Sequence, residues 1–263
     1  FAYVENYENF FDRIYKSVDI KGGKDPFVFN SSIDFENVNF SYGNNQILNL
    51  CNFKLIKNKI TAIVGKSGAG KSTILDLLTY LYKPSSGKIL VDGKDYSTIK
   101  KEDIRRNIGM VTQDVNIMND SIRKNLTFTS NRKILDKEIL KVAEIAGISD
   151  FINSRPDGLD SKIGDSGSLV SGGQLQRISF ARCLLEKKKI IILDEPNSSM
   201  DKNTSKFITN YLKSIKNKVT VLIVAHSSDI VQYAQHVYLL EKKKTSYLGQ
   251  LKNKSNFKYK GLK

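Results

Sequence analysis

The feature that most constrains this chain is a glycine-rich segment between an apolar strand pattern and a helical pattern. The segment fits G-x-x-x-x-G-K-[ST] and reads Gly65, Lys66, Ser67, Gly68, Ala69, Gly70, Lys71, Ser72, Thr73. Glycines let a backbone wrap closely around phosphates, and the N–H groups at a helix start attract anions. We therefore predict a nucleotide-phosphate site here. Lys71 is expected to reach the β- and γ-phosphates, and the Ser72 hydroxyl to ligate Mg²⁺.

A second strand pattern ends in two acidic residues. The short apolar run Ile190–Leu193 is followed directly by Asp194 and Glu195. A strand beside the phosphate loop can deliver Asp194 to the Mg²⁺ shell, and Glu195 can then polarise the attacking water. Two acids after a strand can also form a helix cap or a surface turn. The phosphate loop in the same chain favours the catalytic interpretation.

A serine and two glycines precede another helical pattern, between the phosphate loop and the acids. Ser171, Gly172 and Gly173 stand directly before the helix expected over Gln174–Glu186. Ser171 can cap this helix, which makes a second anion-binding helix N-terminus. One nucleotide does not need two such sites on one domain. We therefore expect a dimer in which Ser171 of one copy contacts the γ-phosphate held by Lys71 of another.

The order of these three segments resembles the ATP-binding cassette (ABC) family over residues 33–250. Two departures from the family pattern are visible. Val170 replaces the Leu that usually begins the signature Leu-Ser-Gly-Gly-Gln. Asn58 and Lys59 stand where the family usually has Gly before the phosphate-loop strand. Because Asn tolerates a left-handed turn, we expect that turn to be kept.

Further residues take a role only through this resemblance. Tyr42 resembles the aromatic platform that stacks on adenine, and Gln113 resembles the glutamine that senses Mg²⁺ and water and faces the membrane domain. Asp201 ends a segment, residues 198–201, that resembles the dimer-contact loop. His226 resembles the switch histidine that touches the γ-phosphate, whereas His236 has no such position and is expected to be structural.

The predicted site therefore has three groups of residues, and the resemblance implies an active ATPase that uses ATP and Mg²⁺. The catalytic residues are expected to be Glu195, His226, Lys71 and Gln113. The Mg²⁺ ligands are expected to be Ser72, Gln113 and Asp194. The nucleotide is expected to contact Tyr42, residues 65–73, Ser171, Gly172, Gly173, Gln174 and Asp201.

Strand and helix patterns alternate along the chain, which indicates a parallel sheet covered by helices. The resemblance makes this α/β fold more specific: a P-loop NTPase core with a parallel sheet and flanking helices, an N-terminal antiparallel β subdomain, and a helical signature subdomain over about residues 114–180. We expect residues 1–32 to form an amphipathic helix and linker from the membrane domain, residues 33–250 the ATP-binding domain, and residues 251–263 a basic tail.

Two segments resemble the exporter branch of the family. Residues 161–167 resemble its cross-talk loop, with Asp165 where Glu is usual, and residues 119–125 also look like exporters. The resemblance implies that two such domains, alike or different, sandwich two ATP molecules and drive export across a membrane. The chain begins at Phe1 and has no apolar run near the roughly 20 residues of a membrane helix. We therefore expect a fragment whose transmembrane domain belongs to the same longer chain, at the cytoplasmic face of the cell membrane.

The composition leaves two alternatives to weigh. The net charge of +15 suits nucleic acid as well as an anionic membrane leaflet. DNA-repair and chromosome-structure ATPases share the cassette signature, but they place a long coiled coil or zinc modules between the positions of Gln113 and Ser171. A translation-factor ATPase would show two cassettes in one chain. We therefore expect no nucleic-acid partner, and we expect Cys51 and Cys183 to be buried free thiols.

Overall fold

The computed structural model describes residues 22–112, 115, 117–130, 132–163, 170–196, 202–225 and 228–249, with only the backbone for 202–206 and 228–229. The helix expected over residues 1–19 and the basic tail lie outside these residues. Among the described helices, none is long and apolar enough to cross a bilayer. The chain divides into two compact units: Phe1–Lys57, Gly65–Asn107 and Tyr238–Tyr247, and Asn58–Val64, Ile108–Val237 and Leu248–Lys263.

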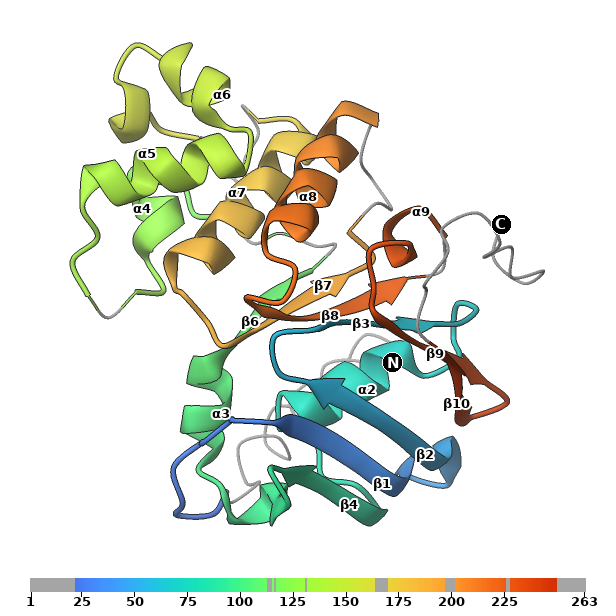
Figure 1. Cartoon of the computed structure of the whole chain (residues 1–263). Helices are drawn as coiled ribbons and strands as arrows, with labels where there is room; N and C mark the ends of the chain where they lie inside the picture. The colour runs from blue at the N-terminus through green and yellow to red at the C-terminus, as the bar shows by residue number, and fades with distance from the viewer. Residues whose placement is uncertain are drawn as a thin grey trace, which may run out of the picture. The chain divides into compact units, whose positions relative to one another are not determined.

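The first unit is built on a four-stranded sheet with antiparallel pairing, in the order β2-β1-β4-β5 (Figure 1). Its strands are β1 (Ser32–Tyr42), β2 (Asn45–Ile56), β4 (Ser86–Val91) and β5 (Lys94–Asp95). On one face, Phe35 and Phe53 stack with ring centroids 4.2 Å apart. This sheet confirms the expected antiparallel subdomain. The residue pattern predicts a strand over Phe53–Ile56, whereas β2 begins already at Asn45 because its whole length pairs with β1.

The helices of the first unit are α2 (Lys71–Leu78), the 3₁₀ helix η1 (Tyr96–Thr98) and α3 (Lys101–Asn107). The residue pattern predicts a helix over Lys71–Leu81, whereas α2 ends at Leu78. The chain turns there because Tyr80 adopts a left-handed φ of 57°, and the Leu81 N–H donates to the Asp76 carbonyl at 2.8 Å. This is a Schellman ending, with Tyr in the place that Gly usually takes.

The second unit is built on parallel strands. They are β3 (Ile60–Val64), β6 (Ile108–Val111), β7 (Ile190–Asp194) and β8 (Thr220–Ala225). They belong to a six-stranded sheet in the order β10-β9-β3-β8-β7-β6. Strand β9 (His236–Glu241) begins in the second unit and continues in the first. Strand β10 (Lys244–Gly249) begins in the first unit and ends in the second. Strands β3 and β8 are buried throughout, as continuous apolar runs in a parallel sheet should be.

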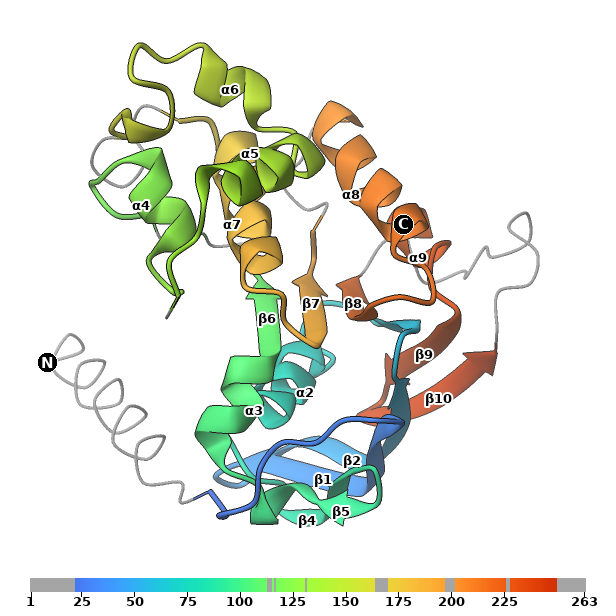
Figure 2. The same ribbon diagram turned by 60° about the vertical axis from the view of Figure 1, so that its left-hand side comes forward.

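Helices make up the rest of the second unit. They are α4 (Ile122–Thr127), α5 (Asp136–Ile145), α6 (Ser149–Asn153), the 3₁₀ helix η2 (Gly158–Asp160), α7 (Gly172–Leu185), α8 (Lys202–Ser214) and α9 (Ser228–Val231). Helices α4 to α7 lie together in both views, within the region expected to be helical (Figures 1 and 2). Phe180 of α7 packs edge-on against Tyr211 of α8, with ring centroids 5.1 Å apart.

Three local expectations are confirmed. Asn58, just before β3, has the left-handed φ of 58° that its place in the turn requires. The dipeptide Asp92–Gly93 predicts a two-residue hairpin turn, and both residues have the positive φ that such a turn demands, 51° and 82°. Cys51 and Cys183 are buried and unpaired. Burial raises the pKa of the Cys183 thiol to about 12, so this thiol stays protonated and unreactive.

Two glycines, one inside β4 and one just after it, give a test of the first unit. Gly87 has φ 80°, and a Cβ there would lie 2.2 Å from the Asn37 carbonyl oxygen of β1. Gly93 has φ 82°, and a Cβ there would meet nothing within 4 Å. We expect Gly93→Ala to cost about 1 kcal/mol of unfolding free energy, from the left-handed backbone alone, and Gly87→Ala roughly 2–3 kcal/mol. Urea unfolding measures both, and equal losses would contradict the described packing of β4 on β1.

Candidate functional site

The phosphate loop lies where the sequence places it, between the end of β3 at Val64 and the start of α2 at Lys71. Lys71 is only 6% exposed. Its Nζ donates to the backbone carbonyls of Gly65, at 2.9 Å, and Lys66, at 3.0 Å. The side chain therefore folds back over the beginning of the loop, which keeps its positive charge beside the loop rather than in bulk water.

The backbone of this loop fits a chain of phosphates. No side chain caps the start of α2, and no acidic residue lies in its first turn, so the N–H groups there face no competing carboxylate. Gly70 has φ 103°, and a Cβ there would lie 2.9 Å from Ile47, so only glycine suits this position. Around Gly68, at φ 75°, the space is open. These are the features of an anion cradle.

Tyr42, the residue expected to stack on adenine, ends β1 in the same unit as the loop. Its hydroxyl donates to the Asp76 carboxylate of α2 at 3.0 Å. Its ring meets Phe40 and Tyr82 edge-on, with centroids 4.8 and 5.3 Å away. Burial raises the pKa of Tyr42 to about 12, although the nearby Thr73 side chain acts against this. The side chain is 41% exposed, so part of a neutral, well-supported ring is open to a ligand.

The predicted acids lie at one edge of the parallel sheet. Strand β8 pairs with β3 on one side, where Ala225 faces Val64, and with β7 on the other, where Val224 faces Asp194. Because the strands are parallel, Asp194 lies at the edge where β3 ends and the phosphate loop begins. The Glu195 N–H donates to the Val224 carbonyl at 2.9 Å, with a left-handed φ of 46°. Such backbone strain in a non-glycine residue is often found at functional sites.

The serine and glycines of the signature segment form the expected helix start. The Ser171 hydroxyl accepts a hydrogen bond from the Gln174 N–H at 3.4 Å, and the Gln174 side chain accepts one from the Ser171 N–H at 3.0 Å. This capping box begins α7 two residues before the start predicted at Gln174. A Cβ on Gly172 would meet nothing within 4 Å, so the approach to this helix end is open.

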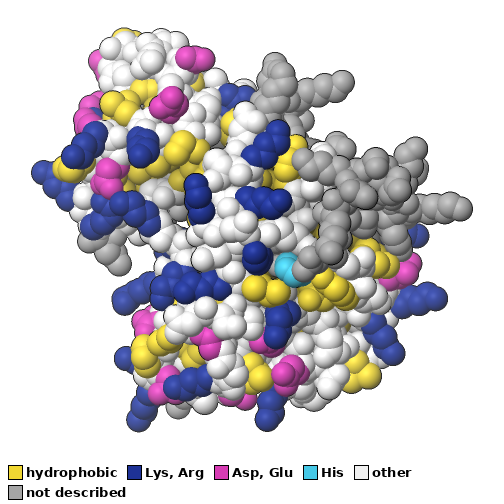
Figure 3. Space-filling model, in the orientation of Figure 1, with side chains coloured by type: hydrophobic (Ala, Val, Ile, Leu, Met, Phe, Trp, Pro, Cys, Tyr) yellow, Lys and Arg dark blue, Asp and Glu magenta, His cyan; other side chains and the backbone are white. Residues whose placement is uncertain are grey.

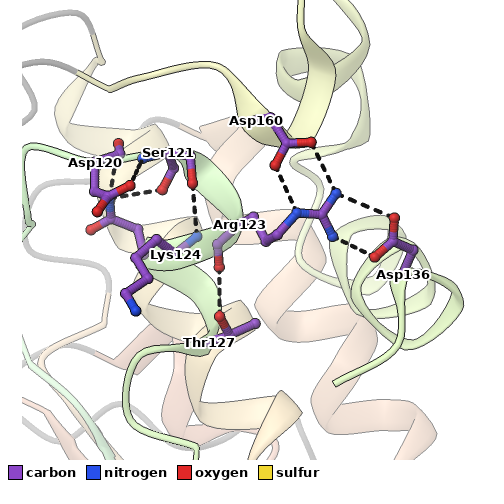
Figure 4. Close-up of polar contacts among 8 residues, drawn as sticks. Asp120, Ser121, Arg123, Lys124, Thr127, Asp136 and Asp160 are labelled. Atoms are coloured by element: carbon purple, nitrogen blue, oxygen red, sulfur yellow. Dashed lines mark hydrogen bonds and ion pairs between the residues drawn. The ribbon is translucent and has the colours of Figure 1, made fainter. Parts of the chain in front are cut away.

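An ion-pair network that the sequence did not reveal joins α4, η2 and α5 (Figure 4). Arg123 of α4 binds Asp160 of η2 through two contacts, at 2.7 and 3.1 Å, and also pairs with Asp136 at the start of α5. These hydrogen bonds, to Asp160 first and then to Asp136, raise the pKa of the guanidinium further. The partners are distant in sequence, so no local pattern pointed to them.

Backbone hydrogen bonds extend the same connection. The Ile122 N–H donates to the Ser161 carbonyl at 3.0 Å, and the Ile163 N–H donates to the Asp120 carbonyl at 3.1 Å. The segment that leads toward Ser171 is therefore held against the segment that follows the position of Gln113.

The predicted site residues fall into two sets. The first unit holds Tyr42 and the loop from Gly65 to Thr73, and the second holds the segment from Ser171 to Gln174, with Asp194 and Glu195. Within the described residues, no three His, Cys, Asp or Glu side chains are grouped as metal ligands. Three predicted residues lie outside the described part of the chain, and their roles stay predictions: Gln113, Asp201 and His226.

A phosphate cradle between strand and helix, and a parallel sheet with acids at its carboxyl edge, define a nucleotide-binding protein of the P-loop class. The pattern of the ABC transporter family matches residues 48–198, which is more than half of the chain. The chain therefore belongs to the ABC transporter family and carries its ATP-binding domain.

The relatives that this chain resembles are named as export proteins or as a flippase. An export ATP-binding/permease protein of Rickettsia typhi is 39% identical over 83% of this chain and 38% of its own length. An ATP-dependent lipid A-core flippase of Idiomarina loihiensis is 36% identical over 80% of this chain and 36% of its own length. A solved structure of a bacterial Atm1-family ABC exporter with ATP bound gives a TM-score of 0.79 at 32% identity, over 84% of this chain and 39% of that one. The chain thus spans well under half the length of these relatives.

The Arg123 network can be tested by its contribution to stability. Both carboxylates are more than 60% exposed, so each pair is expected to contribute little to stability on its own. We expect Arg123→Ala to lower the unfolding free energy by about 1 kcal/mol at low salt, and by less at 1 M salt because the pairs are screened. The neighbouring Lys124→Ala is the control. A loss that does not depend on salt would show that the charges are not responsible.

Proposed function

We propose that this chain is the ATP-hydrolysing domain of an ABC exporter, which dimerises around two Mg-ATP and drives the export of a substrate across a membrane. The observation that carries the proposal is the phosphate cradle. Lys71 folds onto its own loop at the uncapped start of α2. The strand that leads into this loop ends at the same sheet edge as Asp194.

Each part of the proposed site would have its own role in binding or hydrolysing ATP. Lys71 and the loop N–H groups would hold the β- and γ-phosphates, and the Tyr42 ring would carry the base. Ser72 and Asp194, with Gln113, would ligate Mg²⁺, which when bound neutralises charge on the phosphate oxygens. Glu195 would orient and polarise the attacking water. His226 would contact the γ-phosphate.

A second copy would complete each site. The uncapped helix start of α2 can hold one set of phosphates, and the open start of α7 at Ser171 offers a further anion-binding end. Asp201 would contribute at the same dimer contact. We propose that the partner is another nucleotide-binding domain, the same or similar.

The export role rests on the named relatives and on the length of the chain. Because this chain spans less than two fifths of the two curated relatives, we propose that a membrane domain in the same longer protein is its partner. The domain would then act at the cytoplasmic face of the membrane. Exporters alternate between inward and outward states, and closure of the ATP sandwich would supply the force.

A DNA-repair or chromosome-structure ATPase is less well supported. Among the described residues between Ile108 and Ser171, the longest helix is α5, Asp136–Ile145, far too short for a coiled-coil arm. Figure 3 shows Lys and Arg side chains spread over the visible face among acidic and apolar ones, rather than gathered in one stripe. On this face, such a distribution does not outline a path for nucleic acid.

Glu195→Gln tests the proposed water-polarising group. We expect ATP binding to be kept and hydrolysis to fall by roughly 100-fold or more, because the carboxylate is lost but not its shape. Light scattering with and without Mg-ATP should show a monomer converting to a dimer, and added DNA should change nothing. A variant that stays monomeric and hydrolyses ATP normally would show that Glu195 is misassigned, and a DNA-dependent dimer would favour the repair ATPase.

Lys71→Ala tests the cradle itself. Removing the ammonium takes away a charge-assisted contact to phosphate, so we expect ATP affinity to fall by roughly 30- to 100-fold. Calorimetric titration measures the affinity, and Lys88→Ala, on an exposed position of β4, is the matched control. Unchanged affinity in Lys71→Ala would place the nucleotide elsewhere.

A further inference from the structure

The aromatic platform, Tyr42, is connected to the helix of the phosphate loop through Asp76. Tyr42 ends β1, and Asp76 lies on α2, the helix that Lys71 begins. The two residues are 34 positions apart in sequence, yet the Tyr42 hydroxyl donates to Asp76 Oδ2 at 3.0 Å. The phenol hydroxyl is therefore anchored to α2.

The other contacts of the Tyr42 ring are at right angles to it. Phe40 lies at 87° and Tyr82 at 86° to the ring plane. Edge-to-face contacts of this kind support a ring without covering it completely, and the side chain remains 41% exposed. The hydrogen bond at the hydroxyl then limits the swing of the ring about its remaining torsions.

The hydrogen bond between Asp76 and Tyr42 is expected to contribute little to the stability of the fold. Within the described part of the chain, the carboxylate of Asp76 has the Tyr42 hydroxyl as its only hydrogen-bond partner. Burial raises the pKa of Asp76, and the hydrogen bond with Tyr42 lowers it again. A partly desolvated carboxylate with one neutral partner gains little net stability. Its benefit is geometric, because a charged acceptor holds a phenol more strongly than a neutral one does.

We infer that Asp76 is a positioning residue for the nucleotide base, which holds the Tyr42 ring at a fixed place relative to the phosphate loop. The inference rests on the proposed stacking role of Tyr42. A ring that is already ordered loses little conformational entropy when a base stacks on it. Because Asp76 belongs to α2, the helix that begins at Lys71, the base platform and the phosphate cradle keep a constant separation, which suits an adenine joined to a triphosphate.

The test compares a ligand that has a base with one that has none. We would measure the affinity of the folded chain for a non-hydrolysable ATP analogue and for inorganic tripolyphosphate, each with Mg²⁺. Tyr42→Phe removes the hydroxyl and keeps the ring, and Asp76→Ala removes the acceptor. We expect each variant to bind the ATP analogue roughly five-fold more weakly, a loss typical of one newly ordered side chain, and to bind tripolyphosphate as the parent does.

Two further variants separate positioning from structural damage. Asp76→Asn keeps an acceptor oxygen and should recover part of the affinity for the ATP analogue. Glu102→Ala, which removes an exposed carboxylate from α3, should change neither affinity. The double variant Tyr42→Phe/Asp76→Ala should bind no more weakly than the weaker single variant, because both changes break one contact.

The outcomes distinguish this inference from the proposed function. If Tyr42→Ala weakens binding of the ATP analogue but Asp76→Ala and Tyr42→Phe do not, the inference fails and the stacking role stands. If Asp76→Ala weakens both ligands equally, the residue supports α2 rather than the base, and the inference also fails. If Tyr42→Ala leaves the preference for the ATP analogue over tripolyphosphate unchanged, both the stacking role and the inference are overturned.

Discussion

The parallel pairing of β8 with its two neighbours is the constraint on which the proposed chemistry depends. This pairing brings Val64 opposite Ala225 and Asp194 opposite Val224, so three strands end at one edge. The phosphate loop follows the first of these strands, and the acids follow the third. Strands β3 and β8 are buried along their whole length, so their backbone groups are paired within the sheet and hold this register. The buried apolar faces of these strands therefore protect the geometry of the site.

Two features restrict the conformation of the phosphate loop. Gly70 adopts a backbone angle that other residues avoid, and a larger side chain there would collide with Ile47. Lys71 is held by two carbonyls of its own loop before any ligand arrives. An ordered loop with its charge in place loses less entropy on binding a triphosphate, which is the physical value of preorganisation. The Tyr42–Asp76 contact would extend the same principle from the phosphates to the base.

The helical part of the second unit is organised by charge as well as by packing. Arg123 gathers α4, α5 and η2 through two carboxylates, and the backbone bonds of Ile122 and Ile163 lie beside it. Exposed pairs of this kind contribute little to stability individually. They do fix how a short helix is oriented on its neighbours. In an ATPase that closes around nucleotide, such a connection would let a movement near the position of Gln113 reach the segment before Ser171.

Several features of the site follow from the residue pattern alone. The strand–loop–helix order around Lys71, the cap at Ser171 and the left-handed turn at Asn58 are local, and short-range sterics and hydrogen bonds decide them. The sequence by itself therefore determined a phosphate-binding α/β protein, and its motif order already identified the family.

Only the tertiary structure decided which distant side chains meet. Nothing in the sequence near Asp76 indicates Tyr42, and nothing near Arg123 indicates Asp160, because these pairs form only when separate elements pack. The end of α2 at Leu78 is a similar case, since the helical pattern runs on to Leu81 and the left-handed turn at Tyr80 stops it. Periodicity along a chain reports which face of an element is buried, but the partner across that face is set by the packing of the whole fold.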